Sequence, residues 1–521
     1  MTNATMTNTT RQTLWTHDEI IAATGGQCSA AFAVKGVSID TRSLAPGDLF
    51  VALSGVERDG HAYVAAAFNA GASAALVLRG KIDAAEAGGP VVEVDDVAEA
   101  LEQIAHASRA RSQAYITAVT GSVGKTSVKE ALKVALSRSG ETFASEKSFN
   151  NHIGVPLSLA RMPQDCTYAV FEIGMNHAGE IDALVRMVRP HCAVITHIGT
   201  AHIEHFNSEA DIARAKGEIF NAMANGGTAI IPADSPHVDL LENLAAAQSI
   251  SDLRSFSLAS ANVRKGAQKA SGNISNNNAD ETTSDATSDA AIEAAHIVAN
   301  TIYLHDTCSC VVGRVGAEDI TYKVGTPGLH HVSNSLAVLG AVQAAGGDLA
   351  LASLSLAEVE ALSGRGQRHV LQVAGGECLL IDESYNANPV SMAAAITGLG
   401  LAPRLGQGRR IAVLGDMAEL GEVSSQLHAD LADLMDTSDI DLVFSCGAQM
   451  AHMFANLPAD RRGVHADTPA QLTDILKSEI HAADVVMIKG SHASQMHLIV
   501  ERLLEAQATR ADHREEKRNV I

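Results

Sequence analysis

The stretch TGSVGKTS, residues 120–127, decides how the middle of this chain folds. The residues before it, AYITAVT (114–120), form a β-branched, apolar run that is typical of a buried strand. After it, apolar residues follow helical spacing, which predicts a helix over 127–139. A strand, a glycine turn and a helix are the setting of a phosphate-binding loop, because backbone N–H groups at the start of a helix attract an anion.

The loop offers the groups that a nucleoside triphosphate and its magnesium ion need. Lys125 would reach the β- and γ-phosphates, and the Thr126 hydroxyl would bind Mg²⁺. The common motif G-x-x-x-x-G-K-T needs glycine where this chain has Val119, so the loop is shorter here. The alternative is a chance glycine turn before a helix, but both flanks favour nucleotide binding. The residues expected around the phosphates are Gly121, Ser122, Val123, Gly124, Lys125, Thr126 and Ser127.

Length and composition narrow the class of protein. A chain of 521 residues predicts about three domains, at roughly 100–200 residues each. The net charge of −22 argues against a nucleic-acid partner. No apolar run reaches the roughly 18 residues of a membrane helix, and the N-terminus lacks a secretory signal. The seven cysteines are scattered, so we expect a cytoplasmic enzyme, without membrane insertion, in a reducing compartment.

The order of apolar runs predicts an α/β protein of three domains. Residues 13–111 have a mixed α/β pattern. Strands alternate with helices over 112–328, which predicts a central parallel sheet that carries the phosphate loop. A second alternating set over 329–507 predicts a doubly wound, Rossmann-like domain.

Three segments fall outside this pattern. Residues 259–293 are rich in Ser, Asn, Asp and Thr and have almost no large apolar groups, so we expect a disordered surface insertion. Residues 1–12 and 508–521 are expected to be frayed tails.

Polar residues end two strands of the central domain, where ligands of open parallel sheets bind. Glu172 ends YAVFEIG (168–174), and its carboxylate would meet Mg²⁺. The alternative is a carboxylate that caps a helix or pairs with an arginine. The next strand leads to a cluster of histidines that lacks the H-E-x-x-H zinc spacing. His202 is our candidate for Mg²⁺ or phosphate, and an ordinary loop histidine is an equal alternative on spacing alone.

Lys216 lies in an unusual place in the helix expected over 209–224. It falls at helical spacing with Ile212, Ile219 and Met223, so it belongs to the apolar stripe. One interpretation is a side chain whose ammonium extends outward to water, and the pattern alone favours it. The other is a desolvated lysine with a lowered pKa, whose neutral amine could add CO₂ to form a carbamate.

The third domain also ends its strands in charged groups. Asp382, Glu383, Asp416 and Lys489 follow apolar runs, and a shared sheet edge would suit a zwitterionic, amine-bearing substrate. Each residue alone has an ordinary alternative as a helix cap or a surface charge.

Several blocks together resemble the Mur ligases of bacterial peptidoglycan synthesis over nearly the whole chain. TGSVGKTS resembles the ATP loop of that family, which accounts for Val119. DESYNANPVSM (382–392) and VLGDMAELG (413–421) resemble the D-Ala-D-Ala-adding branch. Further blocks that resemble the family are SFNNHIGVPLSLARM (148–162), FEIGMNHAGEI (171–181), AHIEHF (201–206), AKGEIF (215–220), PGLHHVSNSLAVLGA (327–341), DTRSLAPGDLF (40–50) and DGHAY (59–63).

The resemblance implies an ATP-dependent amide ligase. ATP would phosphorylate the terminal carboxylate of UDP-N-acetylmuramoyl-tripeptide, and the amine of D-alanyl-D-alanine would attack the acyl phosphate. Two Mg²⁺ ions would neutralise the converging oxygens. A monomer is expected. Rivals are a sibling ligase that adds a diamino acid, a folylpolyglutamate-type synthetase, and a nucleotide-binding scaffold without catalysis.

The resemblance also implies roles for single residues. Lys125, Glu172, His202 and Lys216 match the catalytic group. Thr126, Glu172 and His202 would hold Mg²⁺, and Lys216 matches a carbamylated lysine that bridges to the second Mg²⁺. This reverses the preference for an outward-reaching ammonium. The implied contacts are Asn150, Asn151, Asn334, Arg365 and Arg368 for ATP; Thr41, Arg42, Ser43 and His61 for the UDP group; and Asp382, Glu383, Tyr385, Asn386, Asn388 and Lys489 for D-Ala-D-Ala.

Three positions depart from the family pattern. His331 and His492 stand where the family commonly has Asn and Arg, and Glu383 stands where it commonly has Asp. These departures affect individual contacts and leave the expected reaction class unchanged.

Overall fold

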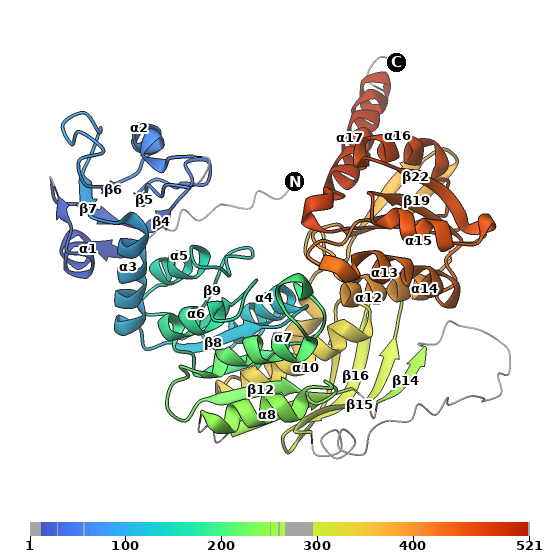
Figure 1. The fold of residues 1–521 in the computed structure, drawn as a ribbon, viewed down its shortest axis with the longest axis horizontal. Coiled ribbons are helices and arrows are strands. Elements are labelled where there is room, and N and C mark those ends of the chain that lie inside the picture. Colours follow the sequence, from blue (N-terminus) through green and yellow to red (C-terminus); the bar gives the residue numbers. More distant parts are fainter. Residues whose placement is uncertain are drawn as a thin grey trace.

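The computed structural model describes residues 12–28, 30–55, 58–248, 250, 252–258, 261–265, 295–404 and 406–518. They form an N-terminal, a central and a C-terminal unit, each built on its own main sheet. In Figure 1 the N-terminal unit (blue) and the C-terminal unit (orange to red) stand at opposite ends of the central unit, on the same side of it. The predicted α/β class is confirmed.

The N-terminal unit has a 5-stranded sheet of order β2-β7-β6-β5-β4, in which only β2 and β7 pair antiparallel. Helices α1 and α3 pack in one core cluster and α2 in another. Its elements are β1 (Trp15–Thr16), α1 (His17–Thr24), β2 (Gln27–Cys28), β3 (Ala33–Val34), β4 (Gly36–Ser38), β5 (Asp48–Val51), η1 (Gly60–Tyr63), α2 (Val64–Asn69), β6 (Ala74–Leu78), β7 (Val91–Val94) and α3 (Val97–Arg111).

The central unit has a 10-stranded sheet whose order is β17-β16-β15-β13-β12-β11-β8-β10-β9, with β14 paired to β15. Its strands are β8 (Tyr115–Thr120), β9 (Thr142–Ala144), β10 (Tyr168–Glu172), β11 (Cys192–Ile195), β12 (Thr228–Pro232), β13 (Asp252–Ser257), β14 (Asn262–Lys265), β15 (Ile297–Leu304), β16 (Ser309–Val315) and β17 (Glu318–Val324). Its helices are α4 (Lys125–Leu136), α5 (Gly154–Arg161), α6 (Glu180–Val188), η2 (Ile203–His205), α7 (Glu209–Gly217), η3 (Glu218–Phe220), α8 (Val238–Ala247), α10 (Leu329–Ala344), α11 (Leu349–Ser355) and η4 (Leu356–Glu358).

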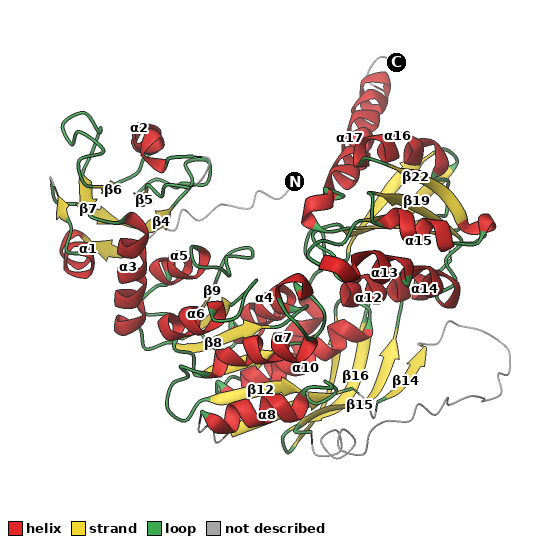
Figure 2. Cartoon of the chain, in the orientation of Figure 1, coloured by secondary structure: helices red, strands yellow, loops and turns green. Residues whose placement is uncertain are grey.

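Helices cover both faces of the central sheet, as Figure 2 shows in red and yellow. One core cluster contains residues of α5, α6, α7 and α8, and the other contains residues of α4, α10 and α11. Strands β10 and β11 are buried at every position, and β8 at all but its first. Burial on both faces explains why these strands read as continuous apolar runs without polar alternation.

The C-terminal unit has a 6-stranded sheet of order β18-β19-β23-β20-β21-β22, parallel except for the β18–β19 pair. Its elements are β18 (Gln367–Val373), β19 (Gly376–Glu383), α12 (Pro389–Leu401), β20 (Arg410–Gly415), η5 (Gly421–Val423), α13 (Ser424–Ala429), α14 (Leu431–Thr437), β21 (Leu442–Cys446), α15 (Met450–Asn456), η6 (Ala459–Arg461), β22 (Arg462–Ala466), α16 (Pro469–Glu479), β23 (Val485–Lys489), η7 (His492–Ser494) and α17 (His497–Arg518).

The core of the central unit continues past the boundary predicted at 328/329. Side chains of α10 and α11, including Leu336 and Ala352, pack in the same buried cluster as α4 and the central strands. We therefore propose that the central domain ends after η4 and that the C-terminal domain begins near β18.

Two segments differ from the sequence expectations. Within the predicted insertion 259–293, residues 262–265 form β14 and pair with β15, so the expectation of disorder is wrong for them. The tail predicted over 508–521 is helical through Arg518, as part of α17. Residues 1–11, 266–294 and 519–521 lie outside the described residues. No helix among the described residues is long and apolar enough to cross a bilayer.

Replacing Leu336 with alanine tests the packing of α10 on the central sheet. Leu336 is fully buried, so L336A should lower the free energy of unfolding by about 2–5 kcal/mol, because it removes apolar contacts and leaves a cavity. Urea unfolding followed by circular dichroism measures the change. The control is L354A, since Leu354 in α11 is 70% exposed and its loss should change little. Equal stability of the two variants would contradict the packing.

Candidate active site

The candidate site lies at β8 of the central sheet, where the order in which the chain adds strands reverses. Strand β8 has β10 on one side and β11 on the other. The connections after these strands diverge there and leave a crevice beyond their carboxyl ends. The loop after β8, Glu172 at the end of β10 and Thr196 just after β11 therefore meet.

The phosphate loop is held in a conformation that requires its glycines. Gly121 has φ 150°, and a Cβ there would lie 2.0 Å from the Thr196 hydroxyl oxygen. Gly124 has φ 87° and precedes α4, and a Cβ there would lie 2.7 Å from Oδ1 of Asn334. Ser122 fixes the loop to the neighbouring turn, since its hydroxyl donates to the carbonyl of Gly199 at 2.8 Å. The backbone is thus shaped for close approach of a ligand.

Lys125 folds back over this loop. Its ammonium donates to the carbonyl of Gly121 at 2.7 Å. Burial lowers the pKa of Lys125, and the attraction of Glu172 acts in the opposite direction. A half-buried ammonium over a glycine loop is placed to meet the charge of a phosphate.

Thr126 and Glu172 form the buried polar centre of the site. The Thr126 hydroxyl donates to one carboxylate oxygen of Glu172 at 2.8 Å, and the Asn150 side-chain amide donates to the other at 2.7 Å. Glu172 is 1% exposed. A hydroxyl beside a carboxylate is a hard oxygen pair of the kind that Mg²⁺ prefers, so these residues fit the predicted ion.

Lys216 of α7 is buried, and this contradicts the outward-reaching ammonium that the helical pattern alone favours. Its side chain is 2% exposed. Burial lowers its pKa well below the ordinary value, and the nearby charge of Lys125 adds to the effect. No carboxylate lies within ion-pair distance of its ammonium in the described part of the chain. Burial and the charge of Lys125 therefore both act against the charged form of Lys216.

His202 is held by a residue of the C-terminal unit. Its Nδ1 contacts the carboxylate of Glu419, which lies in the loop after β20. Both residues have positive φ, 62° for His202 and 61° for Glu419. Burial lowers the pKa of His202, and Glu419 opposes that shift. The contact occupies Nδ1, and Nε2 has no hydrogen-bond partner among the residues that the structure describes, so Nε2 is the ring nitrogen that would meet a ligand.

Across the crevice, the C-terminal unit forms one wall of the site, and this wall carries an acidic and a basic side chain. Glu383 at the end of β19 and Lys489 at the end of β23 lie 3.6 Å apart, and Lys489 also donates to the carbonyl of Asn386 at 2.9 Å. Burial raises the pKa of Glu383 and lowers that of Lys489, while each partner opposes the shift of the other. The Arg365 guanidinium lies 4.1 Å from the ring centre of Tyr385.

Most of these groups line one cavity of about 560 Å³, but Gly121, Lys216 and Glu419 are not among its lining residues. It is lined by the phosphate loop, Glu172, His202, Asn334 and the wall of the C-terminal unit. Among the predicted residues, those that line it are Ser122, Val123, Gly124, Lys125, Thr126, Ser127, Asn150, Glu172, His202, Asn334, Arg365, Glu383, Tyr385, Asn386, Asn388 and Lys489.

Several predicted residues have structural contacts instead. Asp382 accepts hydrogen bonds from Gly364 N at 2.9 Å and from the Ser384 hydroxyl at 2.5 Å, so it fixes the local turn. Asn151 accepts from Gly154 N at 2.9 Å at the start of α5. Asn388 accepts from Ser391 N at 2.9 Å and caps α12, although it also lines the cavity. Asp416 caps α15 through Met450 N at 2.7 Å.

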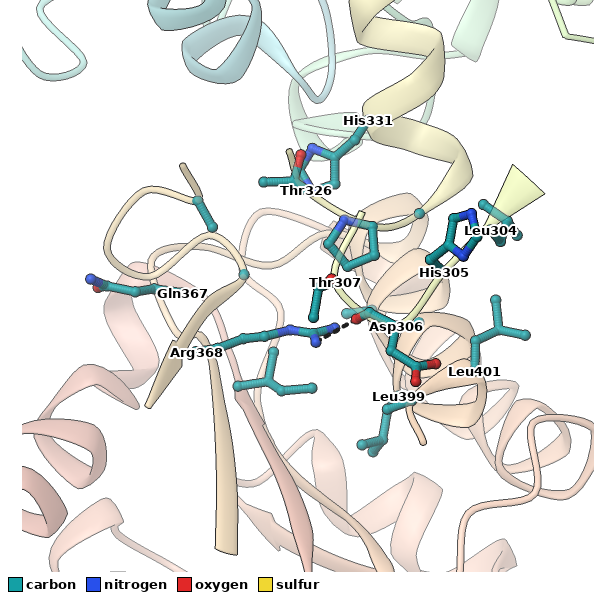
Figure 3. A pocket seen from close by; sticks show the side chains of 18 of the residues that line it. Leu304, His305, Asp306, Thr307, Thr326, His331, Gln367, Arg368, Leu399 and Leu401 are labelled. Carbon is teal, nitrogen blue, oxygen red and sulfur yellow. Dashed lines mark hydrogen bonds between the residues drawn. The ribbon is translucent and has the colours of Figure 1, made fainter. Parts of the chain in front are cut away.

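Arg368 lies in a second cavity, of about 1160 Å³ (Figure 3). Its guanidinium donates to the carbonyl of Asp306 at 2.6 Å, between the β15–β16 turn and the C-terminal unit. The structure therefore does not bring Arg368 together with the phosphate loop. The two cavities share five lining residues, so they adjoin there: His330, His331, Glu383, Ala394 and Ala395.

The residues predicted for the UDP group lie in the N-terminal unit, away from the cavity. Thr41, Arg42 and Ser43 form a turn in which Arg42 pairs with Asp40 at 2.6 Å. His61 is buried, and both its ring nitrogens are engaged: Nδ1 with Asp59 at 2.5 Å and Nε2 with Leu78 N at 2.9 Å. His61 therefore holds the fold and offers no free nitrogen to a ligand.

Comparison with known families agrees with this arrangement. Residues 33–109 match the Mur ligase family catalytic domain, residues 119–342 the Mur ligase middle domain, and residues 364–492 the Mur ligase glutamate ligase domain. The chain belongs to the Mur ligase family. The predicted family membership is confirmed.

Named relatives of this Mur ligase share one activity in their names. UDP-N-acetylmuramoyl-tripeptide–D-alanyl-D-alanine ligase of Escherichia coli (strain K12) is 34% identical over 479 residues, 91% of this chain and 95% of that protein. The Bacillus subtilis (strain 168) protein of the same name is 31% identical over 482 residues, 91% of this chain and 94% of that protein. The crystal structure of MurF from Acinetobacter baumannii has a TM-score of 0.76 at 28% identity and covers 94% of this chain and 99% of that one.

Two contacts of the C-terminal unit were missed from the sequence. Glu419 lies within the block VLGDMAELG, and it pairs with His202. The Tyr385 hydroxyl donates to the Ser148 hydroxyl at 2.8 Å, from a block that was expected to meet D-Ala-D-Ala. Each contact joins a central block to a C-terminal block that resembles the family, so the sequence marks the blocks but does not show which of them meet.

Replacing Gly124 with alanine tests the loop geometry. A non-glycine residue at φ 87° costs about 1–2 kcal/mol, and the Cβ would press on Asn334. We expect G124A to weaken binding of magnesium and a non-hydrolysable ATP analogue by about 5- to 30-fold, measured by calorimetry. The control is G179A, since Gly179 has φ 88° with nothing within 4 Å and lies outside the cavity. Equal affinities in both variants would refute the assignment.

Proposed function

We propose that this Mur ligase joins D-alanyl-D-alanine to the terminal carboxylate of UDP-N-acetylmuramoyl-tripeptide, with ATP giving ADP and phosphate. The observation that carries the proposal is the single cavity in which the phosphate loop faces the Glu383–Lys489 wall. A ligase of this type must bring a phosphoryl group, an acid and an amine together. The names of the relatives supply the substrates of the proposal.

In the first step the tripeptide carboxylate would take the terminal phosphoryl group of ATP. Lys125 and the backbone N–H groups at the start of α4 would hold the phosphates. Thr126 and Glu172 would hold Mg²⁺, which when bound neutralises charge on the phosphate oxygens. Asn150 keeps the Glu172 carboxylate oriented through its 2.7 Å hydrogen bond.

In the second step the amine of D-Ala-D-Ala would attack the carbonyl carbon of the acyl phosphate, so that the amide C–N bond forms, the C–O bond to phosphate breaks and phosphate leaves. The dipeptide carries an ammonium and a carboxylate, and the wall offers Glu383 for the first and Lys489 for the second. The ammonium must lose a proton before it attacks. Glu383, whose pKa burial raises, is the group of this wall suited to accept that proton. Asn386 and Tyr385 line the same part of the cavity and would orient the dipeptide.

The UDP group of the substrate would lie on the N-terminal unit. Thr41, Arg42 and Ser43 remain the proposed contacts, and His61 would act only by holding the turn of η1. Arg365 would meet the ATP phosphates from the C-terminal unit, because it lines the cavity.

Lys216 is the proposed site of a carbamate. Its neutral amine would add to CO₂, forming an N–C bond and releasing the amine proton, and the product is an anionic oxygen ligand for a second Mg²⁺. Burial and the lowered pKa support the proposal, since only the neutral amine can react.

Omission of single substrates tests the proposed reaction. We expect phosphate release only with ATP, UDP-N-acetylmuramoyl-tripeptide and D-Ala-D-Ala together, because the acyl phosphate needs the acid and its turnover needs the amine. The assay should compare tripeptides ending in diaminopimelate and in lysine. Release that ignores the dipeptide, or that a free diamino acid supports equally well, would reject the proposal in favour of a sibling ligase.

Replacing Lys216 with alanine tests the carbamate. K216A should lose most activity, and a small carboxylic acid such as acetate should restore part of it by supplying the missing anionic oxygens. The wild-type protein with ¹³C-bicarbonate should show a carbamate carbon signal that K216A lacks. Full activity of K216A, or the same signal in both proteins, would exclude the role.

A further inference from the structure

Lys129, in the second turn of α4, is a buried lysine that the proposed reaction does not use. Its side chain is fully buried. The ammonium donates to the carbonyls of Ser145 at 2.5 Å and Lys147 at 2.6 Å, and it lies 2.7 Å from the carboxylate of Glu130. A lysine is rarely fully buried unless it is paired, and here three acceptors converge on one ammonium.

Two of these acceptors belong to the 145–151 loop, which follows β9 and contacts Glu172, the proposed magnesium ligand. Glu172 N donates to the Ser145 hydroxyl at 3.3 Å, and the Asn150 amide donates to the Glu172 carboxylate at 2.7 Å. Lys147 within the loop has φ 48°, a left-handed conformation that is uncommon for a lysine. Such a residue persists where surrounding contacts determine it, and its carbonyl is held by Lys129.

The same loop contacts the other two units. Ser148 receives the hydrogen bond from Tyr385 of the C-terminal unit at 2.8 Å. Glu146 pairs with Arg161 at 2.7 Å, and Arg161 donates to the carbonyl of Val37 in the N-terminal unit at 2.6 Å. The loop is thus the place where contacts from both outer units reach the residues around Glu172.

We propose that Lys129 is a positioning residue that fixes the 145–151 loop, so that Asn150 orients Glu172 while Ser148 meets Tyr385. Lys129 lies in α4, the helix that follows the phosphate loop. The same helix therefore positions both the phosphate loop and the 145–151 loop. The inference rests on the proposed function only in that Glu172 serves a nucleotide-bound magnesium ion.

The test compares K129M with K133M. Methionine is an unbranched side chain one atom shorter than lysine, and it removes the charge and the donors. Lys133 is an exposed lysine one turn later in the same helix. Calorimetry with ADP, in magnesium and in EDTA, reports nucleotide affinity. Hydrogen–deuterium exchange reports the backbone of residues 145–151.

K129M should weaken magnesium-dependent ADP binding by about ten- to a hundred-fold, the loss typical of a residue that orients a metal ligand. Binding in EDTA should change little, exchange should rise within 145–151, and K133M should match the wild type. Unchanged affinity and exchange in K129M would overturn the inference. So would a uniform rise in exchange across the central sheet, which would show general destabilisation.

A K129M protein that does not fold would be replaced by K129Q, which keeps one donor group, with the same expectations and the same refuting results. This test can fail without refuting the proposed function, because neither calorimetry with ADP nor hydrogen–deuterium exchange involves the peptide substrates. If the wild-type protein binds magnesium and ADP but its phosphate release does not depend on D-Ala-D-Ala, the ligase proposal is refuted and the inference on Lys129 is not affected.

Discussion

The buried carboxylate of Glu172 is the constraint on which the rest of the site depends. A carboxylate that is 1% exposed is costly unless donors or cations surround it. Thr126 donates from the phosphate helix and Asn150 from the 145–151 loop, so two separate chain segments are tied to one pair of oxygens. The central sheet makes this possible, because β8 and β10 are neighbours and their carboxyl ends meet at the same edge.

The positive charges of the site follow from the same geometry. Lys125 is attracted by the Glu172 carboxylate, Lys216 is buried, and both lysines lower the pKa of His202. Lys125 and Arg365 bring two positive charges beside the single carboxylate of Glu172, so the phosphate loop attracts an anion. A triphosphate would meet these charges, and the same arrangement therefore accounts for nucleotide affinity.

Much of this could be predicted from the sequence because the signals are local. The strand, glycine turn and helix around TGSVGKTS and the acidic end of YAVFEIG depend on short-range patterns, and the structure places them as expected. The helical period also put Lys216 in the apolar stripe, but it could not decide between burial and an outward-reaching ammonium. The sequence did not predict which way individual side chains point. Asp382 and His61 make hydrogen bonds within their own domains, and the partner of His202 is 217 residues away in the chain. Such pairings depend on how the domains are set against each other, which no periodicity records.

The contacts of the C-terminal unit suggest why ligation would be coupled to the presence of the second substrate. Tyr385 reaches Ser148, beside the segment that holds Glu172, and Glu419 reaches His202 on the other side of β8. The two contacts come from different loops of one unit, so a rigid movement of that unit would change both together. Tyr385 and Asn386 also line the part of the cavity proposed for D-Ala-D-Ala. A dipeptide that holds this unit in place would therefore also hold both sides of the phosphate site, and water would be excluded while the acyl phosphate exists.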